Sequence, residues 1–322
     1  DDGSANQIGI APGAEWIACA GCPDGGCTDS ALLGCAEFVA APTDLTGNNP
    51  NPDMRPNAVN NSWGDCGTTY DPWFADVIAG WHAVGTYPIF SNGNSSNCGY
   101  ASPPGLNTVG NPARSGNVTG VGSSGEQNGQ YASHSNWGPT DNLDIINPVA
   151  GYDMMKPQVI APGVSIRSSV PTSDTSYEDG WTGTSMSAPH VTGLVALIWQ
   201  AAPCLVGEYA ATETIIESTA VDLVYNDGSA LTPTDFPNFA TGWGEIDALA
   251  AVNMASGMCA MGTLEGMVTT DGTTPVEGAK IFADNGAGYT KNIYTLADGT
   301  YSTGLPEGTY TLTASKYGYE TE

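Results

Sequence analysis

The sequence predicts an α/β fold, in which a parallel sheet carries helices on both faces, followed by a small all-β sandwich domain. Short apolar runs alternate with helical patterns as far as Cys259, and helical patterns stop after it. With 322 residues and 40% hydrophobic content, the chain can bury one large core and a smaller second one. We therefore predict two domains, at residues 1–260 and 261–322.

The elements of the first domain follow from periodicity. Four short apolar runs predict strands at Ala58–Val59, Tyr87–Phe90, Val118–Val121 and Val159–Ile160. Four stretches with apolar residues three and four positions apart predict helices at Trp73–Val84, Ser187–Ala201, Tyr209–Ser218 and Glu245–Val252. Ligands of such sheets bind beyond the carboxyl ends of the strands, so we expect the functional residues to gather there.

The second domain shows strand alternation instead. Tyr310, Leu312 and Ala314 alternate with polar residues, and turns are predicted at Asp271-Gly272, Asp298-Gly299 and Glu307-Gly308. Exposed aromatic residues here could bind a carbohydrate or a protein partner. The alternative, which we favour, is that these tyrosines belong to the core of the strands.

The charge of the chain limits its partners. Seven Lys and Arg stand against 34 Asp and Glu, so the formal net charge is −27. Such a field repels nucleic acids and anionic membranes, and we expect neither as a partner. The longest good apolar run, Leu194–Trp199, is far too short to span a bilayer, so no membrane span is predicted.

The most informative segment is Gly183–Gly193, which reads Gly-Thr-Ser-Met-Ser-Ala-Pro-His-Val-Thr-Gly. It places Ser185 where an apolar helix begins, with Pro189 in the first turn, where its missing N–H costs nothing. Free N–H groups and the helix dipole at such an end stabilise negative charge on a reacting carbonyl oxygen. This arrangement suits acyl transfer.

This segment resembles the nucleophile motif of the subtilisin-like serine peptidases, the subtilases. Further segments resemble that family in the same order along the chain: Ile8–Gly13, Asn60–Gly64, Phe90–Asn94, Asn111–Ala113, Tyr131–Pro139 and Lys156–Ser165. The resemblance covers roughly residues 1–255 and implies a subtilisin-like fold. In the second domain, Pro275–Ala279, Asp298–Ser302 and Pro306–Tyr310, followed by Tyr317-Gly-Tyr319, resemble the carboxypeptidase regulatory-like β-sandwich.

The resemblance implies the roles of the site residues. Ser185 is expected to be the nucleophile, and Asn94 is expected to donate its side-chain amide to the oxyanion. The segments Ser62, Trp63, Gly64 and Ser91, Asn92, Gly93 are expected to bind the substrate from opposite sides. Taken alone, Asn94 could also be a turn residue, and Trp63 could be part of the core.

The chain does not show the rest of a catalytic triad. A serine needs a general base, and the base needs an orienting carboxylate. The histidine and aspartate motifs of the family are absent, and none of the three histidines, His82, His134 and His190, is a good substitute. We therefore expect the triad Asp and His upstream of Asp1, and we expect this chain alone to be inactive.

Eight cysteines in loop-like segments predict disulfides and an extracellular location. Cys66 and Cys98 flank the two cleft segments, and Cys204 and Cys259 bracket the C-terminal helices, so we expect these two pairs. Two more disulfides are expected between Cys19 and Cys35. The alternative is a zinc site at Cys19 and Cys22.

No cofactor is required by this chemistry, although calcium is a possible structural ion because relatives carry it. The loops Asn48–Asp53 and Asp141–Asp153 are rich in oxygen ligands but lack the spacing of a calcium loop, so no metal ligands are predicted. Three functions remain: a secreted serine endopeptidase acting on proteins or peptides, a non-catalytic peptide-binding or structural module, and an esterase-like hydrolase.

Overall fold

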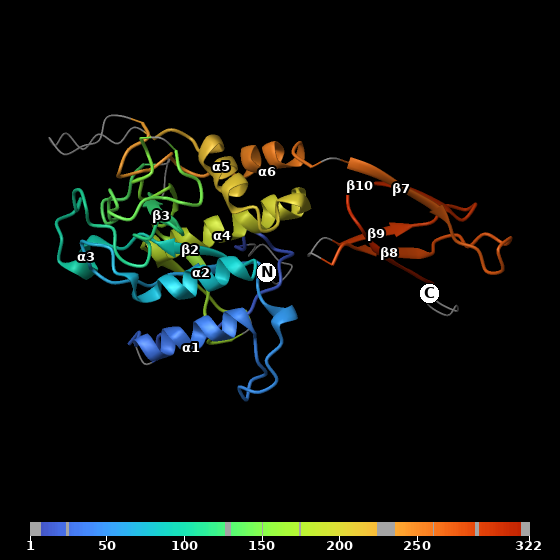
Figure 1. The fold of residues 1–322 in the computed structure, drawn as a ribbon, viewed down its shortest axis with the longest axis horizontal. Coiled ribbons are helices and arrows are strands. Elements are labelled where there is room, and N and C mark those ends of the chain that lie inside the picture. Colours follow the sequence, from blue (N-terminus) through green and yellow to red (C-terminus); the bar gives the residue numbers. More distant parts are fainter. Residues whose placement is uncertain are drawn as a thin grey trace. The chain divides into compact units, whose positions relative to one another are not determined.

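A computed structural model of the chain describes residues 8–23, 26–125, 130–149, 151–173, 175–223, 236–259, 261–286 and 290–316. The chain forms two compact units (Figure 1). The first contains residues 1–197 and 207–251, and the second contains residues 198–206 and 252–322.

A four-stranded parallel sheet forms the centre of the first unit, in the order β1 (Ala58–Asn61), β2 (Tyr87–Ser91), β3 (Thr119–Ser124) and β4 (Val159–Pro162). Each strand is paired with the next, so the carboxyl ends of all four strands point the same way. Every residue of β2 and β3 is buried, as expected when both faces of a parallel sheet are covered. The predicted strands and their parallel arrangement are confirmed.

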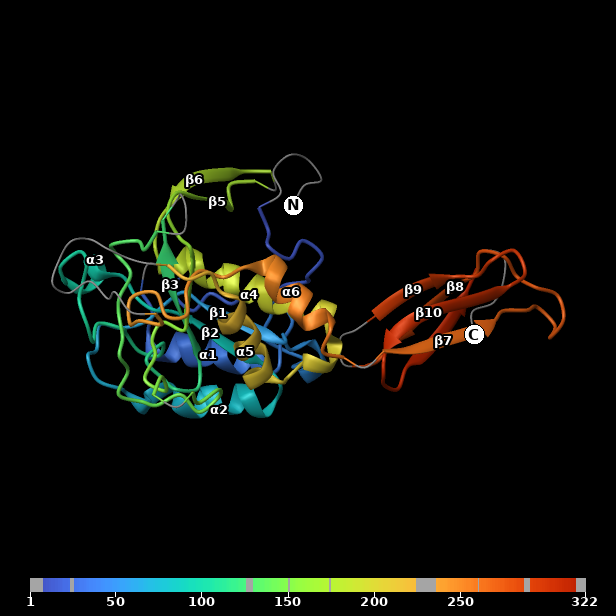
Figure 2. The same cartoon turned by 90° about the horizontal axis from the view of Figure 1, so that it is seen from above.

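Helices cover the two faces of this sheet. α1 (Asp29–Ala40) and α2 (Ala75–Ala83) lie on one side, and α4 (Thr184–Ala201) and α5 (Tyr209–Thr219) lie on the other (Figure 2). Leu32 of α1 and Ile78 of α2 belong to one buried apolar cluster with Phe90 of β2. The prediction of helices on both faces is confirmed.

Several helix boundaries differ from the sequence prediction. The segment expected as one helix from Trp73 begins with a 3-10 turn, η3 (Pro72–Phe74), because the Asp71 side chain accepts from the Trp73 N–H. α6 (Ala248–Ser256) starts after Asp247, whose carboxylate accepts from the Ala250 N–H at 2.9 Å. α4 starts at Thr184, earlier than expected, and therefore includes Ser185.

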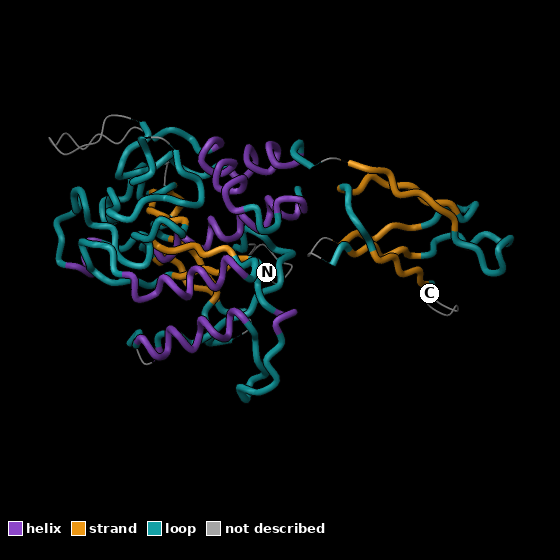
Figure 3. Tube along the Cα trace, in the orientation of Figure 1, coloured by secondary structure: helices purple, strands orange, loops and turns teal. Residues whose placement is uncertain are grey.

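Several elements were not predicted from the sequence. One is α1, although its buried residues Leu32, Ala36 and Val39 lie at helical spacing. The others are the short helix α3 (Ser95–Cys98), the 3-10 turns η2 (Pro52–Met54) and η4 (Pro203–Leu205), and the antiparallel hairpin of β5 (Ile166–Ser169) and β6 (Tyr177–Trp181). β6 is almost entirely exposed, so no apolar face marks it. Figure 3 shows that loops make up much of the remaining chain in this unit.

The second unit contains the predicted small β-domain. It has a two-stranded antiparallel sheet and a three-stranded one, in the orders β10-β7 and β11-β8-β9. The strands are β7 (Met261–Met267), β8 (Lys280–Asp284), β9 (Thr290–Tyr294), β10 (Thr300–Pro306) and β11 (Thr311–Ser315). Gly272 and Gly299, at two of the predicted turns, have φ of +81° and +75°, which glycine adopts without strain.

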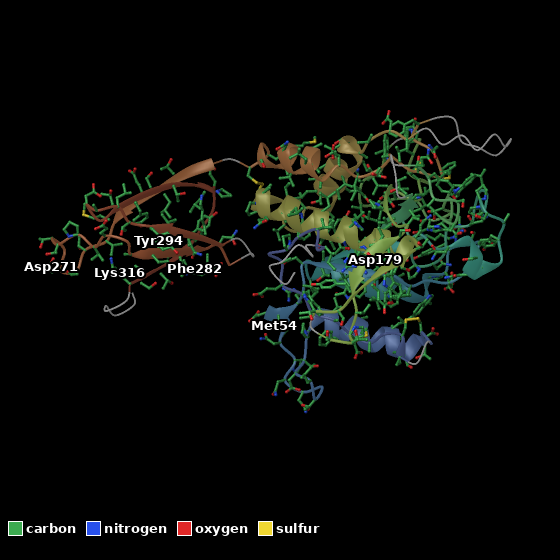
Figure 4. The ribbon with its side chains drawn as sticks, turned by 180° about the vertical axis from the view of Figure 1, so that it is seen from behind. Met54, Asp179, Asp271, Phe282, Tyr294 and Lys316 are labelled. Carbon is green, nitrogen blue, oxygen red and sulfur yellow. A yellow bond between two sulfur atoms is a disulfide. The ribbon has the colours of Figure 1, made fainter. Side chains whose placement is uncertain are left out.

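The tyrosines of this domain divide between its core and its surface. Tyr301 and Tyr310 pack against the buried cluster around Ile281 and Leu305, which agrees with the favoured core interpretation. Tyr294 is 61% exposed, and the Lys280 ammonium lies 5.7 Å from the centre of the Phe282 ring. Figure 4 labels Phe282 and Tyr294. Tyr317 and Tyr319 lie outside the described residues.

All eight cysteines form disulfides, and none is free. Cys66 pairs with Cys98 and Cys204 pairs with Cys259, as predicted. The two further disulfides join Cys19 to Cys35 and Cys22 to Cys27. The alternative of a zinc site at Cys19 and Cys22 is therefore wrong, because both sulfur atoms are already bonded.

Candidate active site

A cleft that is partly open to solvent lies around Ser185. Its lining comes from the chain after β1, the chain after β2 with α3, the loop before β3 and the start of α4. The lining residues are Ser62, Trp63, Gly64, Asp65, Cys66, Ser91, Gly93, Asn94, Asn97, Cys98, Gly110, Asn111 and Ser185. The cleft therefore lies where the carboxyl ends of β1 and β2 meet the start of α4.

Ser185 sits in the first turn of α4 and contacts the chain after β1. Its Oγ donates to the Ser62 carbonyl at 3.3 Å, and Ser62 Oγ donates to the Ser185 carbonyl at 2.8 Å. The turn after β4 holds the same helix end, because Gly183 N–H donates to the Gly163 carbonyl at 2.8 Å. A side chain at Gly163 would collide with the hydroxyls of Ser187 and Ser123. The position of Ser185 is thus fixed from two strands.

Asn94 faces Ser185 from the end of the chain after β2. Its Oδ1 accepts from the Thr184 N–H at 2.9 Å and from Thr184 Oγ1 at 3.1 Å. These two hydrogen bonds orient the side-chain amide, since its oxygen must point at the start of α4. The amide N–H₂ is then the group available to a ligand next to Ser185.

A neighbouring loop supports the turn that carries Asn94. Gly93 has φ of +99°, and its carbonyl accepts from the Asn136 N–H at 3.0 Å. Ser95 N–H donates to the His134 carbonyl at 2.8 Å, and Asn92 Nδ2 donates to the Asn136 carbonyl at 2.5 Å. The segment Tyr131–Pro139 therefore supports the turn that carries Asn94, and none of its residues is among those that line the cleft.

The opposite wall of the cleft is held by Asp65 and Asn111. Asp65 Oδ1 accepts from the Asn111 N–H at 2.9 Å and from the Gly67 N–H at 2.9 Å. Asp65 N–H in turn donates to the Asn111 carbonyl at 2.9 Å. The Cys66–Cys98 disulfide then ties this wall to α3 across the cleft.

Most of the predicted substrate-binding residues line the cleft. Ser62, Trp63, Gly64, Ser91 and Gly93 do so. Trp63 also packs edge-on against Phe74 and Phe90, with its ring centroid 5.1 and 5.4 Å from theirs, so it belongs to the core as well. Its role in substrate binding stays a prediction.

Asn92 differs, because its side chain is fully buried and it is not among the lining residues. We therefore describe it as a positioning residue for the Asn94 turn.

Six lining residues were not predicted as site residues: Asp65, Cys66, Asn97, Cys98, Gly110 and Asn111. Asn111 lies in the segment Asn111–Ala113, for which only the family resemblance was given. The sole sequence signal for Asp65 is its place directly after Ser62-Trp63-Gly64. The other residues come close only through tertiary contacts, which no local pattern reveals.

None of the three histidines lines the described cleft. His190 Nδ1 lies 2.8 Å from the Met186 carbonyl on its own helix, and His82 Nε2 lies 2.7 Å from the Asn117 carbonyl. Burial lowers the pKa of His82 and also that of His134. Within the described residues, the hydrogen bond found for Ser185 Oγ goes to Ser62 and not to a base.

The described residues contain no group of three or more His, Cys, Asp or Glu side chains that could hold a metal ion. Next to the first oxygen-rich loop, Asp44 Oδ1 accepts from Thr46 and Asn48, and Oδ2 accepts from Asn49. These carboxylate oxygens accept hydrogen bonds within a turn. The described helices also include none with the length and apolar character required to cross a bilayer.

Comparison with known proteins identifies the family. Residues 1–244 of this chain match the Subtilase family. This chain belongs to the subtilase family. Residues 263–322 match the carboxypeptidase regulatory-like domain.

The similar proteins are proteases. Bacillopeptidase F of Bacillus subtilis (strain 168) is 40% identical over 267 residues, which cover 83% of this chain. The minor extracellular protease Vpr of the same organism is 38% identical over 112 residues, which cover 34% of this chain. Among solved structures, a protease of Pseudoalteromonas arctica matches with a TM-score of 0.51 and 25% identity, over 72% of this chain and 60% of that chain. The match supports the subtilisin-like fold.

This subtilase chain spans only a small part of these curated relatives. The aligned segments cover 17% of bacillopeptidase F and 13% of Vpr.

Proposed function

We propose that this chain is the serine-bearing part of a secreted serine endopeptidase that hydrolyses peptide bonds through an acyl-enzyme on Ser185. The observation that carries the proposal is the juxtaposition of Ser185, in the first turn of α4, with the Asn94 amide, which Thr184 orients. Membership of the subtilase family and the similarity to proteases support it. The triad Asp and His belong, in this proposal, to sequence that precedes Asp1.

The chemistry follows from the geometry. Ser185 Oγ attacks the scissile carbonyl carbon, and the triad histidine takes its proton and then gives it to the leaving amine. During the attack, the carbonyl oxygen gains negative charge. The Asn94 amide and the Ser185 backbone N–H at the positive end of α4 donate to that oxygen. Water then hydrolyses the acyl-enzyme and releases Ser185.

The substrate lies as an extended strand in this proposal. The backbone of Ser62, Trp63 and Gly64 pairs with it, and Ser91 and Gly93 form the other side of the pocket for its side chain. Extended protein or peptide substrates are therefore favoured over small esters. The four disulfides support an extracellular location. The β-domain binds a protein or carbohydrate partner, if any, through its exposed aromatic side chains.

The test uses the protein expressed with the sequence that precedes Asp1 in its own reading frame, beside residues 1–322 alone. We expect the longer protein to cleave casein and to react with a fluorophosphonate, and Ser185→Ala to abolish both. Residues 1–322 alone should do neither. Turnover of small esters without peptide cleavage would favour the esterase alternative. Peptide binding with no labelling of Ser185 in either protein would favour the non-catalytic module.

A further inference from the structure

Among the residues that line the cleft, Asp65 is the one that carries a charge. We propose that Asp65 makes this site selective for peptides with a basic side chain, arginine or lysine, at the residue whose carbonyl is attacked. The inference rests on the proposed function and names its substrate class. It is carried by the shape of the cleft, by the anchoring of the carboxylate and by the distribution of basic residues.

The shape of the cleft suits a long, slender side chain. Three of its lining residues are Gly64, Gly93 and Gly110, so much of its wall is bare backbone. A Cβ at Gly64 would lie 2.7 Å from the Asn111 carbonyl oxygen, and a Cβ at Gly93 would lie 2.7 Å from Asn136 Nδ2. At these two positions, only glycine leaves room for Asn111 and Asn136, which pack behind the cleft wall. Backbone walls leave the cleft itself open to the substrate.

The carboxylate of Asp65 is held in one place. Its Oδ1 accepts from the N–H groups of Gly67 and Asn111, and from Asn111 Nδ2 at 3.3 Å. The disulfide that follows it, Cys66–Cys98, links this wall to α3. A charge fixed in this way costs little further ordering when a ligand binds, and it can therefore discriminate between ligands.

The charge of Asp65 has no protein counter-ion in the described structure. The two salt bridges found there join Arg114 to Asp141 and Arg167 to Asp179. An apolar side chain in the cleft would remove water from an unpaired carboxylate, which is unfavourable. A guanidinium or ammonium group would instead pair with this exposed carboxylate at the edge of the cleft.

The overall charge of the chain must be separated from this local effect. A net charge of −27 attracts every cationic peptide, wherever it binds. Glu37 provides a matched control, because it is exposed on α1 and is not among the cleft residues. Glu37→Gln and Asp65→Asn each remove one negative charge, but only Asp65→Asn removes it from the cleft. Asparagine also keeps an oxygen that can accept from Gly67 and Asn111.

The experiment compares peptides that differ only at the residue before the scissile bond, which is arginine, lysine or norleucine. The protein carries its own upstream sequence, and kcat/KM is measured for each peptide. We expect arginine and lysine to exceed norleucine by about tenfold or more, as for a close charge pair. Asp65→Asn should reduce that ratio by about tenfold, and Glu37→Gln should leave it unchanged.

Two results would overturn the proposal. One is a wild-type ratio near unity while Ser185-dependent cleavage of the norleucine peptide is intact, which would leave the proposed function standing. The other is an Asp65→Asn variant that loses activity equally on all three peptides, as a purely structural residue would.

If no peptide is cleaved, the proposed function fails, but binding still tests Asp65. Product peptides that end in arginine or norleucine are then titrated into Ser185→Ala and into Ser185→Ala with Asp65→Asn. Tighter binding of the arginine peptide that depends on Asp65 supports the inference, and equal dissociation constants refute it.

Discussion

Both ends of the parallel sheet carry polar side chains, but those at the carboxyl ends face solvent and those at the amino ends are fully buried. At the carboxyl ends, Ser185 and Asn94 are half-buried and face an open cleft. At the amino ends, Tyr87 and Thr119 begin β2 and β3 and are fully buried together with Glu213 of α5. At the open end, the hydrogen bonds of Asn94 leave its amide N–H₂ available to a ligand. At the closed end, hydrogen bonds link the Tyr87 hydroxyl, Thr119 Oγ1 and Glu213 Oε1, and Glu213 Oε2 is buried with no hydrogen bond found in the described residues.

The closed end also shows the largest pKa shifts. Burial raises the pKa of Glu217 to about 8 and that of Glu213 well above its usual value, and burial lowers the pKa of Lys156 to about 8. Lys156 Nζ donates to the Val118 carbonyl at 2.6 Å and to Gln158 Oε1 at 3.1 Å. Perturbed ionisable groups often mark active sites, but here they lie away from the serine. Burial, rather than a role in catalysis, therefore accounts for these pKa shifts.

The largest expected effect on stability comes from removing the cation of the closed end. Lys156→Met removes the buried donor that serves the Val118 carbonyl and Gln158 Oε1. We expect the free energy of unfolding at pH 7 to fall by about 1–3 kcal/mol, the cost of leaving a buried acceptor without its donor. Urea denaturation measures this. An unchanged free energy of unfolding would mean that the desolvation of the Lys156 ammonium cancels the gain from its hydrogen bonds.

At the carboxyl ends of the strands, we expect a substitution to affect catalysis strongly and stability weakly. Asn94→Ala is expected to lower kcat by about 10²–10³-fold, the size known for removal of one oxyanion-hole donor in subtilisin. Its effect on unfolding should stay near 1 kcal/mol, because the side chain is only half-buried. Asn94→Asp keeps an oxygen for Thr184 but has no amide donor, so its kcat should fall as well. Retained activity in Asn94→Asp would remove Asn94 from the oxyanion site.

The pH dependence of stability sharpens the contrast further. The pKa of Glu217 rises from 4.5 to about 8 on folding, so the folded chain binds the extra proton between these values. The stability contributed by this group is fully present below pH 4.5 and is lost as the pH rises towards 8. Glu217→Gln should therefore reduce the loss of stability between pH 5 and pH 8 by about 2–3 kcal/mol.

Thermal unfolding at a series of pH values measures this effect, with Glu37→Gln as the exposed control. Glu213 has the same sign and remains in the variant, so some pH dependence persists. Lys156 has a lowered pKa, so its contribution is present above pH 10.5 and is lost only as the pH falls towards 8. This pH range does not overlap the range of pH 4.5 to about 8 over which Glu217 affects stability. An unchanged pH profile in Glu217→Gln would show that its burial is relieved by water.

The same contrast explains what the sequence could predict. The four strands, the parallel order and the position of Ser185 at a helix start all follow from local patterns. The closed end gave no such signal, because Lys156 and Glu217 are ordinary charged residues until α5 packs on the sheet. Likewise, Asp65 acquires its setting only when Asn111 folds against it.

The helix boundaries were also predicted less well than the helices themselves, because the groups that cap a helix can lie far away in the sequence. α4 includes Thr184 and Ser185 because Asn94, distant in sequence, accepts from the Thr184 N–H and so caps the helix from outside. α1 buries Leu32, Ala36 and Val39 at helical spacing, and the Thr28 hydroxyl accepts from the Ala31 N–H at its start. Tertiary caps of the first kind cannot be predicted from spacing, whereas a local cap of the second kind can.

Asn92 gives the smallest expected effect. It is fully buried, like the polar residues at the amino ends of the strands, but it supports the Asn94 turn at the carboxyl ends. Its Nδ2 donates to the Asn136 carbonyl, and its N–H donates to the Val121 carbonyl at 2.8 Å. Asn92→Ala should cost about 1–2 kcal/mol of unfolding free energy, because the Asn136 carbonyl loses a buried partner. It should also lower kcat by several-fold, well short of Asn94→Ala, because the Asn94 turn becomes less well held. If kcat falls with no change in stability, Asn92 contacts the substrate after all; if only stability falls, the turn is held by Gly93 and Ser95 alone.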